Sequence, residues 1–206
     1  MDNKRIILIG GAPMTGKSTV AHKVARHFDL PWISTDQMRK IMRKVANRAE
    51  HPKLFKLKPE GHSVERLLAE FPVEELLQMQ SEEAEAVWAV ARAFIKEDWM
   101  WTRGFLVEGI HILPHLVARD FGDDARVKAV FLVDDDPSRV RQVVYTRGLS
   151  GDAKSYSDKV KEKEVECVAR FSRHLMGEIE RLRFPWISVT KSDSDLEKVL
   201  AAINFR

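Results

Sequence analysis

The sequence contains very little cysteine. Its one cysteine, Cys167, excludes a disulfide within the chain, and disulfide frameworks are typical of small secreted proteins. The amino terminus shows no signal-peptide pattern, so we expect a cytoplasmic protein. The apolar stretch at residues 6–9 is far shorter than the roughly 20 residues that span a bilayer. We therefore expect no membrane association.

An excess of charge of one sign is also missing. The 34 basic and 31 acidic residues leave a formal net charge of +3. This charge is too small to indicate a nucleic-acid partner, but it permits a locally basic cleft for an anionic substrate. The chain has 206 residues, of which 44% are hydrophobic, so we expect one domain, 1–206, with a substantial core. The sequence is also compatible with a homodimer.

Short apolar segments alternate with longer amphipathic ones along the chain. Apolar runs rich in β-branched residues predict strands at 5–9, 32–34, 105–107, 127–133 and 186–189. Apolar residues at helical spacing predict helices that begin at residues 17 and 36, and others over 63–69, 73–101, 138–147, 158–183 and 193–203. Strands that alternate with helices predict an α/β fold, a three-layer α/β/α domain around a five-stranded parallel sheet.

Two segments stand apart from this alternation. Residues 44–103 are mostly helical and separate the second and third strands, so we interpret them as a helical substrate-binding insertion within the same domain. Within it, residues 51–60 hold two prolines and read as an irregular connector. Residues 147–157 include a polar, glycine-containing stretch, which predicts a mobile lid loop.

The strongest motif is GGAPMTGKST at residues 10–19, which fits the pattern G-x-x-x-x-G-K-[ST]. It follows a predicted buried strand and precedes an amphipathic helix, the context expected of a phosphate-binding loop. Loop amides and the helix amino terminus would cradle ATP, Lys17 would act catalytically beside the β- and γ-phosphates, and Ser18 would bind Mg²⁺. The predicted ATP-binding residues are Gly11, Ala12, Pro13, Met14, Thr15, Gly16, Lys17, Ser18 and Thr19.

A second group of candidates follows the second predicted strand. Because the carboxyl ends of parallel strands line one crevice, Asp36 should lie near the phosphate loop. Its carboxylate could accept the proton of an acceptor hydroxyl or help to hold Mg²⁺. Arg39 and Arg43 lie four residues apart on one helix face and suit a substrate carboxylate or phosphate. The alternatives are a helix N-cap for Asp36 and a solvated helix face for the arginines.

The third predicted strand ends in Glu108 and Gly109. A charged residue that closes a buried strand is costly unless it is paired or functional, so Glu108 is a candidate for Mg²⁺ or for an acceptor hydroxyl. Gly109 would leave room for a ligand. His111 is a candidate substrate contact, with a structural role as its alternative.

The helix after the fourth strand carries three arginines that precede the predicted lid. Arg147 adjoins Gly148 and is the preferred lid residue, which would bind ATP and stabilise charge on the transferred phosphoryl group. Arg139 and Arg141 cannot share one helix face well, so we expect at least one of them to be solvated. Lys154 lies in the lid itself.

The order of these motifs resembles 2-phosphoglycerate kinase and its small P-loop kinase relatives. The resemblance is carried by the phosphate loop, by ISTD at residues 33–36 with Arg39 and Arg43, and by VEGIHILP at residues 107–114. It implies the nucleoside monophosphate kinase and shikimate kinase-like fold, with strand order 2-3-1-4-5, a helical insertion and an arginine lid. It also implies an enzyme that uses ATP and Mg²⁺ to phosphorylate a small anionic hydroxyl compound such as 2-phosphoglycerate. Asp36, Glu108 and Arg147 would then face the reacting groups.

Other functions fit parts of the sequence. A nucleotide or nucleoside kinase would need a pocket for the base. Trp99 and Trp101 could stack on a base, but helix packing explains these residues better. A GTP-binding switch is indicated weakly by TKSD at residues 190–193, but Glu108 and Gly109 stand where D-x-x-G is expected, and Asp193 suits a helix N-cap. An ATP-binding regulator without catalysis is a further alternative.

Overall fold

A five-stranded sheet forms the centre of the molecule. The computed structural model describes residues 4–58, 63–97, 99–148, 155–190, 192 and 194–203. The sheet has the order β2-β3-β1-β4-β5, and every neighbouring pair is parallel. The strands are β1 (Arg5–Gly11), β2 (Trp32–Ser34), β3 (Gly104–Glu108), β4 (Val127–Val133) and β5 (Trp186–Ser188). The predicted sheet and its strand order are confirmed.

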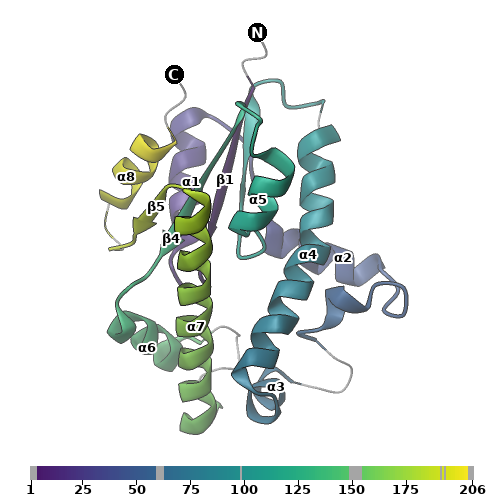
Figure 1. The fold of residues 1–206 in the computed structure, drawn as a ribbon, viewed down its shortest axis with the longest axis vertical. Helices are drawn as coiled ribbons and strands as arrows, with labels where there is room; N and C mark the ends of the chain where they lie inside the picture. Colours follow the sequence, from purple (N-terminus) through teal and green to yellow (C-terminus); the bar gives the residue numbers. More distant parts are fainter. Residues whose placement is uncertain are drawn as a thin grey trace.

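Helices cover both faces of this sheet. One face is covered by α1 (Lys17–Phe28) and α8 (Ser194–Ala202), and the other by α4 (Val73–Glu97), α5 (Pro114–Phe121) and α7 (Asp158–Leu182) (Figure 1). Helix α2 (Thr35–Val45) directly follows β2, and α6 (Pro137–Thr146) follows β4. The predicted three-layer α/β/α arrangement is therefore confirmed.

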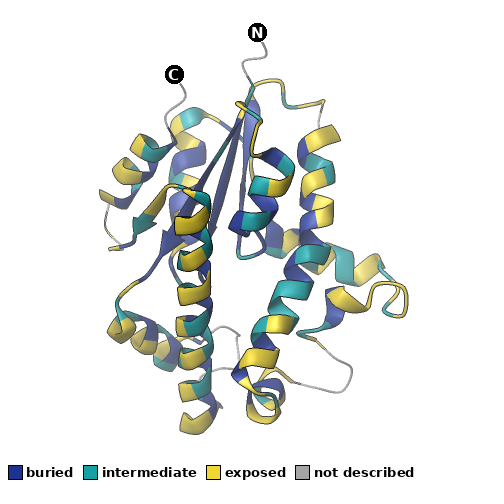
Figure 2. Ribbon diagram, viewed as in Figure 1, coloured by how far each residue is buried: buried dark blue, intermediate teal, exposed yellow. Residues whose placement is uncertain are grey.

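The side-chain alternation of β1 explains why both faces are covered. Ile6 and Leu8 pack with α4, α5 and α7, whereas Ile7 and Ile9 pack with α1 and α8, and all four are fully buried. A strand that is apolar on both sides can be buried only between two layers. Figure 2 shows the middle of the sheet as buried, with exposed residues on the outer sides of the helices and in loops.

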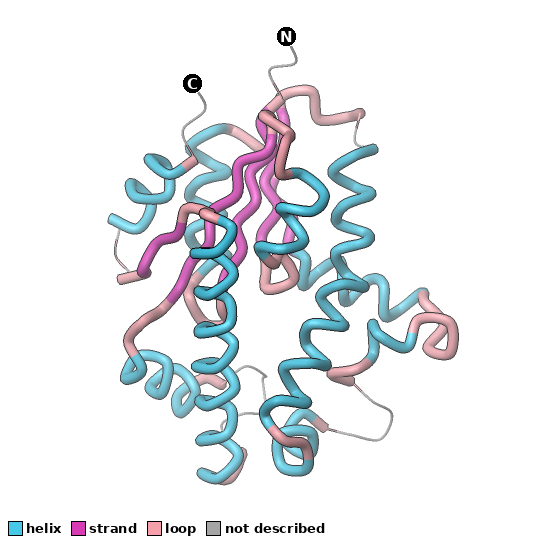
Figure 3. Tube along the Cα trace, in the orientation of Figure 1, coloured by secondary structure: helices cyan, strands magenta, loops and turns pink. Residues whose placement is uncertain are grey.

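Part of the molecule extends beyond the carboxyl edge of the sheet. Between β2 and β3 the chain forms α2, the short 3₁₀ helix η1 (Pro52–Phe55), α3 (Val64–Glu70) and α4. Helix α3 and the first turns of α4 and α7 lie past the strand ends, as the tube in Figure 3 shows. There they share a separate apolar cluster of Leu67, Leu68, Leu76, Tyr156 and Val160.

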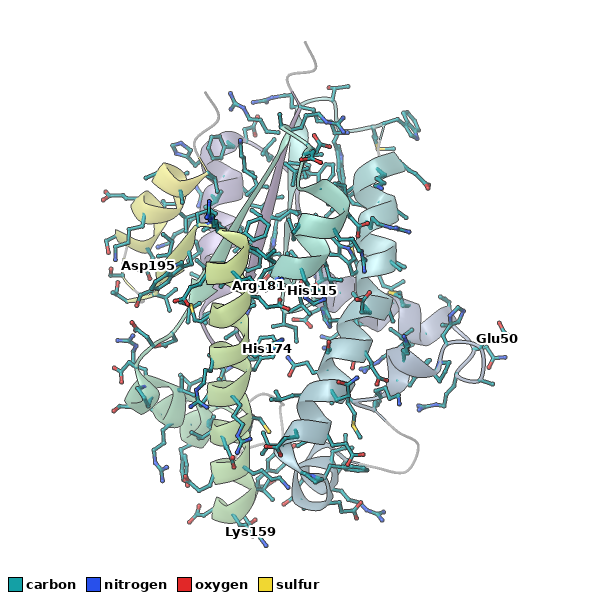
Figure 4. The ribbon with its side chains drawn as sticks, in the orientation of Figure 1. Glu50, His115, Lys159, His174, Arg181 and Asp195 are labelled. Carbon is teal, nitrogen blue, oxygen red and sulfur yellow. The ribbon has the colours of Figure 1, made fainter. Side chains whose placement is uncertain are left out.

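The long helices α4 and α7 are joined through α5 by polar side chains. His115 of α5 lies with Nδ1 2.9 Å from Glu178 of α7 and with Nε2 3.7 Å from Glu85 of α4. The hydrogen bond to Glu178 raises the pKa of His115, despite partial burial. Figure 4 labels His115 beside α7. In the part of the chain that the structure describes, no helix combines the length and apolarity that a membrane span requires.

The structure corrects three details of the predicted elements. The helix expected over residues 73–101 ends at Glu97, and the chain then turns so that the Gly104 N–H donates to the Trp101 carbonyl at 2.9 Å. The expected irregular connector contains η1, whose Leu54 and Phe55 are buried. Helix α5 was not predicted, because its eight residues give too short an apolar pattern.

Candidate functional site

The phosphate loop connects β1 to α1 through a conformation that requires glycine. Gly11 has a φ of +143°, and a Cβ atom there would lie 2.2 Å from the Leu132 carbonyl oxygen. Gly16 has a φ of +78°, but a Cβ atom there would meet nothing within 4 Å. The loop thus packs tightly against β4 at its start and faces open space at its end. That space lies at the amino terminus of α1, where helix amides favour an anion.

Lys17 lies across this loop. Its Nζ donates to the Ala12 carbonyl at 2.6 Å, and the side chain is buried. Burial lowers the pKa of Lys17 to about 8, although the carboxylates of Glu108 and Asp36 favour its charged form. An ammonium group held in this way carries a weakly solvated positive charge beside the loop, as phosphate binding requires.

Glu108 and Ser18 form the oxygen-rich part of the site. The Ser18 hydroxyl donates to Glu108 Oε1 at 3.1 Å, which links the start of α1 to the end of β3. Burial raises the pKa of Glu108, and hydrogen bonds from Ser34 and Ser18 and the charge of Lys17 oppose this effect. A hydroxyl and a carboxylate are suitable ligands for Mg²⁺. Over the described ranges no three acidic, histidine or cysteine side chains gather as a metal site.

Asp36 lies in the first turn of α2 and does not cap it. The N-cap is Ser34, whose Oγ accepts from the Asp36 N–H at 3.2 Å. The N-cap alternative for Asp36 is therefore wrong. The Asp36 carboxylate instead pairs with Arg39 at 3.0 Å and is 44% exposed, so a second molecule can reach it.

The two arginines of α2 are not solvated, as their alternative would require. Arg39 and Arg43 are only 20% and 16% exposed, and both contact Glu83 Oε1 on α4, at 3.3 and 2.7 Å. Arg43 also donates from Nε to the Leu54 carbonyl at 2.9 Å. Burial raises the pKa of Glu83, against the opposing charges of both arginines.

The sequence patterns predicted the helix that carries Glu83 but did not identify Glu83 as a site residue. In the structure α4 begins at Val73, and Glu83 lies in its middle with an exposed fraction of 1%. Glu83 is four residues before the buried Val87 and seven after the buried Leu76, so it falls on the apolar stripe of the helix. A carboxylate at such a position is the signal that could have identified it.

Gly109 and His111 organise the chain between β3 and α5. Gly109 has a φ of +148°, and a Cβ atom there would lie 1.9 Å from Thr35 Oγ1. Its missing side chain thus makes room for Thr35, whose hydroxyl lies 2.8 Å from His111 Nδ1. His111 is buried, and burial together with the charges of Arg39, Arg43 and Lys17 lowers its pKa well below the usual value. His111 is therefore neutral at neutral pH and connects β3 to α2.

Gly109→Ala is expected to destabilise the protein by about 2–4 kcal/mol, from backbone strain and overpacking. The new methyl group would push Thr35 from His111. Gly177→Ala is the matched control, because Gly177 lies exposed in α7 and a Cβ atom there meets nothing within 4 Å. The control should gain about 0.5–1 kcal/mol of helix stability. Chemical denaturation measures both, and equal effects would contradict the assigned packing.

The three arginines around α6 differ in their partners. Arg139 pairs with the buried Asp134 at 2.8 Å and donates to the Val189 carbonyl at 3.1 Å, and Arg141 pairs with Glu162 at 2.5 Å. Arg147 follows the last turn of α6 and is exposed. Arg147 therefore stays the candidate lid residue. Lys154 lies outside the described residues, as do residues 149–153 of the expected lid.

The remaining candidate motifs lie elsewhere or have structural roles. The Thr190 N–H and hydroxyl both donate to the buried Asp195, labelled in Figure 4, at 3.0 and 2.9 Å. Lys191 and Asp193 of the TKSD string lie outside the described residues. Trp101 packs on Phe94 and Phe105. The expected helix packing of Trp99 is wrong, because Trp99 lies after the end of α4 and is 81% exposed, at the edge of the sheet opposite to the phosphate loop. A surface hollow lined by residues 118–126 also lies at this opposite edge.

Relatives of known name share sequence with most of the chain. No model of a protein family matches it. The 2-phosphoglycerate kinase of Methanothermobacter thermautotrophicus is 28% identical over 143 residues, which cover 69% of this chain and 47% of that protein. The 2-phosphoglycerate kinase of Methanopyrus kandleri is 24% identical over 205 residues, 97% of this chain and 60% of that protein. The chain thus spans about half the length of the curated relatives that it matches.

Solved structures share the fold at low sequence identity. Shikimate kinase from Aquifex aeolicus has a TM-score of 0.53 at 13% identity, over 96% of this chain and 95% of that one. A gluconokinase from Sinorhizobium meliloti has a TM-score of 0.51 at 12% identity, over 98% and 93%. The chain therefore has the P-loop NTPase fold found in small kinases, and in sequence it resembles 2-phosphoglycerate kinase.

Proposed function

We propose that this protein is a kinase that transfers the γ-phosphoryl group of ATP to a hydroxyl group of a small anionic metabolite. One observation carries the proposal: the phosphate loop and the start of α2 meet at Glu108, which accepts from Ser18 at 3.1 Å and lies in register with Ser34, two residues before Asp36. Lys17 begins α1 after the loop, Glu108 ends β3 and Asp36 lies in the first turn of α2, so the phosphate loop and the acceptor helix form one charged site. A site that only bound a nucleotide would not need the second carboxylate with its arginines.

Residues of the loop have distinct roles in this proposal. The loop amides and the amino terminus of α1 hold the phosphate groups, and Lys17 stabilises charge on the transferred group. Ser18 and Glu108 would hold Mg²⁺, which when bound neutralises phosphate charge. Arg147, with the loop at residues 147–157, would close over the nucleotide and exclude water.

Asp36 and Arg39 face the acceptor. The acceptor oxygen forms a bond to the γ-phosphorus as the bond from that phosphorus to the bridging oxygen of ADP breaks, and Asp36 takes the hydroxyl proton. Arg39, which pairs with Asp36 at 3.0 Å, also binds the anionic group of the acceptor. A neutral sugar offers no such group, so we expect it to be a poorer acceptor.

Sequence similarity supports 2-phosphoglycerate as the first acceptor to test. The named relatives are 2-phosphoglycerate kinases, and this compound has one free hydroxyl beside a phosphate and a carboxylate. The experiment is a mass-spectrometric screen with ATP, Mg²⁺ and three acceptor classes: phosphorylated hydroxy acids, nucleosides with nucleoside monophosphates, and neutral sugars. Products from the first class alone would support the proposal. Products from the nucleoside class alone, or none, would contradict it.

ATP affinity is expected to fall as pH rises above about 8. Lys17 must be protonated to attract phosphate, and its pKa in the free protein is about 8. Binding stabilises the protonated form, so affinity is complete below that pKa and weakens above it, by up to about tenfold per pH unit. Calorimetric titration with ATP between about pH 7 and 9.5 measures this slope. Lys17→Arg keeps its charge in this range and should give a flat profile, and a flat wild-type profile would contradict the assignment.

A further inference from the structure

Arg39 and Arg43 are held by a carboxylate that belongs to neither α2 nor the strand ends. Glu83 of α4 accepts from both guanidinium groups through the same oxygen, Oε1. Arg43 is fixed a second time by its bond from Nε to the Leu54 carbonyl. Arg39 spans from Glu83 to Asp36. Glu83 is thus the common partner of the two arginines that the proposed function assigns to the acceptor.

The burial of Glu83 restricts the conformations of the two arginine side chains. The side chain of Glu83 is 1% exposed, and a buried carboxylate stays ionised only if charges compensate it. Arg39 and Arg43 supply that compensation. Without the carboxylate of Glu83, the like charges of these two arginines, four residues apart on one helix, would repel each other. Arginines that face a fixed carboxylate have few alternative conformations.

We propose that Glu83 is a positioning residue of the acceptor site. It fixes Arg39 beside Asp36 and holds Arg43 one helical turn further along α2. An acceptor carboxylate or phosphate then meets a guanidinium group that is already oriented. Preorganised guanidinium groups bind planar anions more tightly than free ones, because less side-chain freedom is lost on binding. This inference rests on the proposed function, since it concerns how the same site selects anionic acceptors.

Glu83→Gln tests the position of the arginines directly. The amide keeps the shape of the side chain but loses its charge. Glu82→Gln is the matched control, because Glu82 is the neighbouring residue and pairs with Lys56 at 3.2 Å instead of with the two arginines. In NMR spectra of the arginine Nε–H groups, the Arg39 and Arg43 signals should shift or broaden in Glu83→Gln and stay unchanged in Glu82→Gln. Unchanged signals in Glu83→Gln would overturn the inference, whether or not the protein is active.

Steady-state kinetics then separate positioning from a general structural effect. With 2-phosphoglycerate as acceptor, Glu83→Gln should raise the acceptor KM at least tenfold while the KM for ATP stays within twofold. A purely structural defect would change both constants together, and a lower acceptor KM would show that Glu83 competes with the acceptor. Either result overturns the inference. If Glu83→Gln does not fold, Glu83→Asp keeps the charge, shifts it by one methylene and should raise the acceptor KM alone.

The two proposals fail in different ways. A wild-type protein that phosphorylates none of the acceptors contradicts the proposed function. The guanidinium signals still decide whether Glu83 holds the two arginines in that case. A wild-type protein that is active, with an acceptor KM that Glu83→Gln leaves unchanged, contradicts the positioning role alone.

Discussion

Lys17→Met is expected to lower kcat/KM for ATP by about 10²–10³-fold or more, the effect of removing one preorganised charge from the transition state. Lys17 is buried, and its Nζ donates to the Ala12 carbonyl of the same loop. Methionine fills a similar volume without a charge, and burial already disfavours the charge of Lys17 in the free protein. The folded state should therefore keep its thermal stability while turnover is lost.

Lys40→Met is the control for this substitution. Lys40 is exposed on α2, close in sequence to Asp36 but away from the loop. Kinetics and thermal unfolding of both variants should separate them: the control keeps activity and stability, and Lys17→Met keeps stability alone. A Lys17→Met protein with near wild-type kcat/KM would contradict the role of the loop.

Asp36→Asn is expected to lower kcat by about 10²-fold or more, because an amide cannot accept the hydroxyl proton. Affinity for ATP should change little, since Asp36 belongs to α2 and not to the loop. The pair with Arg39 is 44% exposed on the Asp36 side, so its loss should cost only about 0–1 kcal/mol of stability. Loss of turnover with retained ATP binding would argue against a regulator that binds ATP without catalysis.

Asp123→Asn is the matched control for Asp36→Asn. Asp123 is exposed in the turn before β4, at the edge of the sheet opposite to the phosphate loop. Its replacement should leave kcat and ATP affinity unchanged. If Asp36→Asn retained more than about a tenth of the wild-type kcat, Asp36 would hold the acceptor or the metal and would not act as the base.

Local patterns predicted the part of the site that the chain forms within a few residues. The loop from Gly11 to Ser18 depends on positive φ at Gly11 and Gly16 and on close packing at Gly11. Glu108 was predicted because a charged residue closes a buried strand, and the structure places it 3.1 Å from Ser18. Strand ends of a parallel sheet meet at one edge, so the sequence brings these groups together once the fold class is known.

Contacts between distant helices could not be predicted in the same way. Glu83 reaches Arg39 and Arg43 only because α4 packs against α2, which no local pattern reveals. Arg139 was one of three arginines before the predicted lid, and the structure pairs it with Asp134 five residues earlier. Gly109 was expected to give room to a ligand and gives it to Thr35. In each case the partner side chain decides the role.

An isotope-labelled phosphoryl group shows directly whether the protein transfers the γ-phosphoryl group of ATP to an anionic acceptor. The protein would be incubated with Mg²⁺, 2-phosphoglycerate and ATP that carries ¹⁸O in its γ-phosphate, and the products would be analysed by mass spectrometry. We expect a bisphosphorylated glycerate that contains the label, formed by the wild-type protein and far more slowly by Asp36→Asn. Label that appears only in inorganic phosphate, or that stays in ATP with every anionic acceptor supplied, would contradict it.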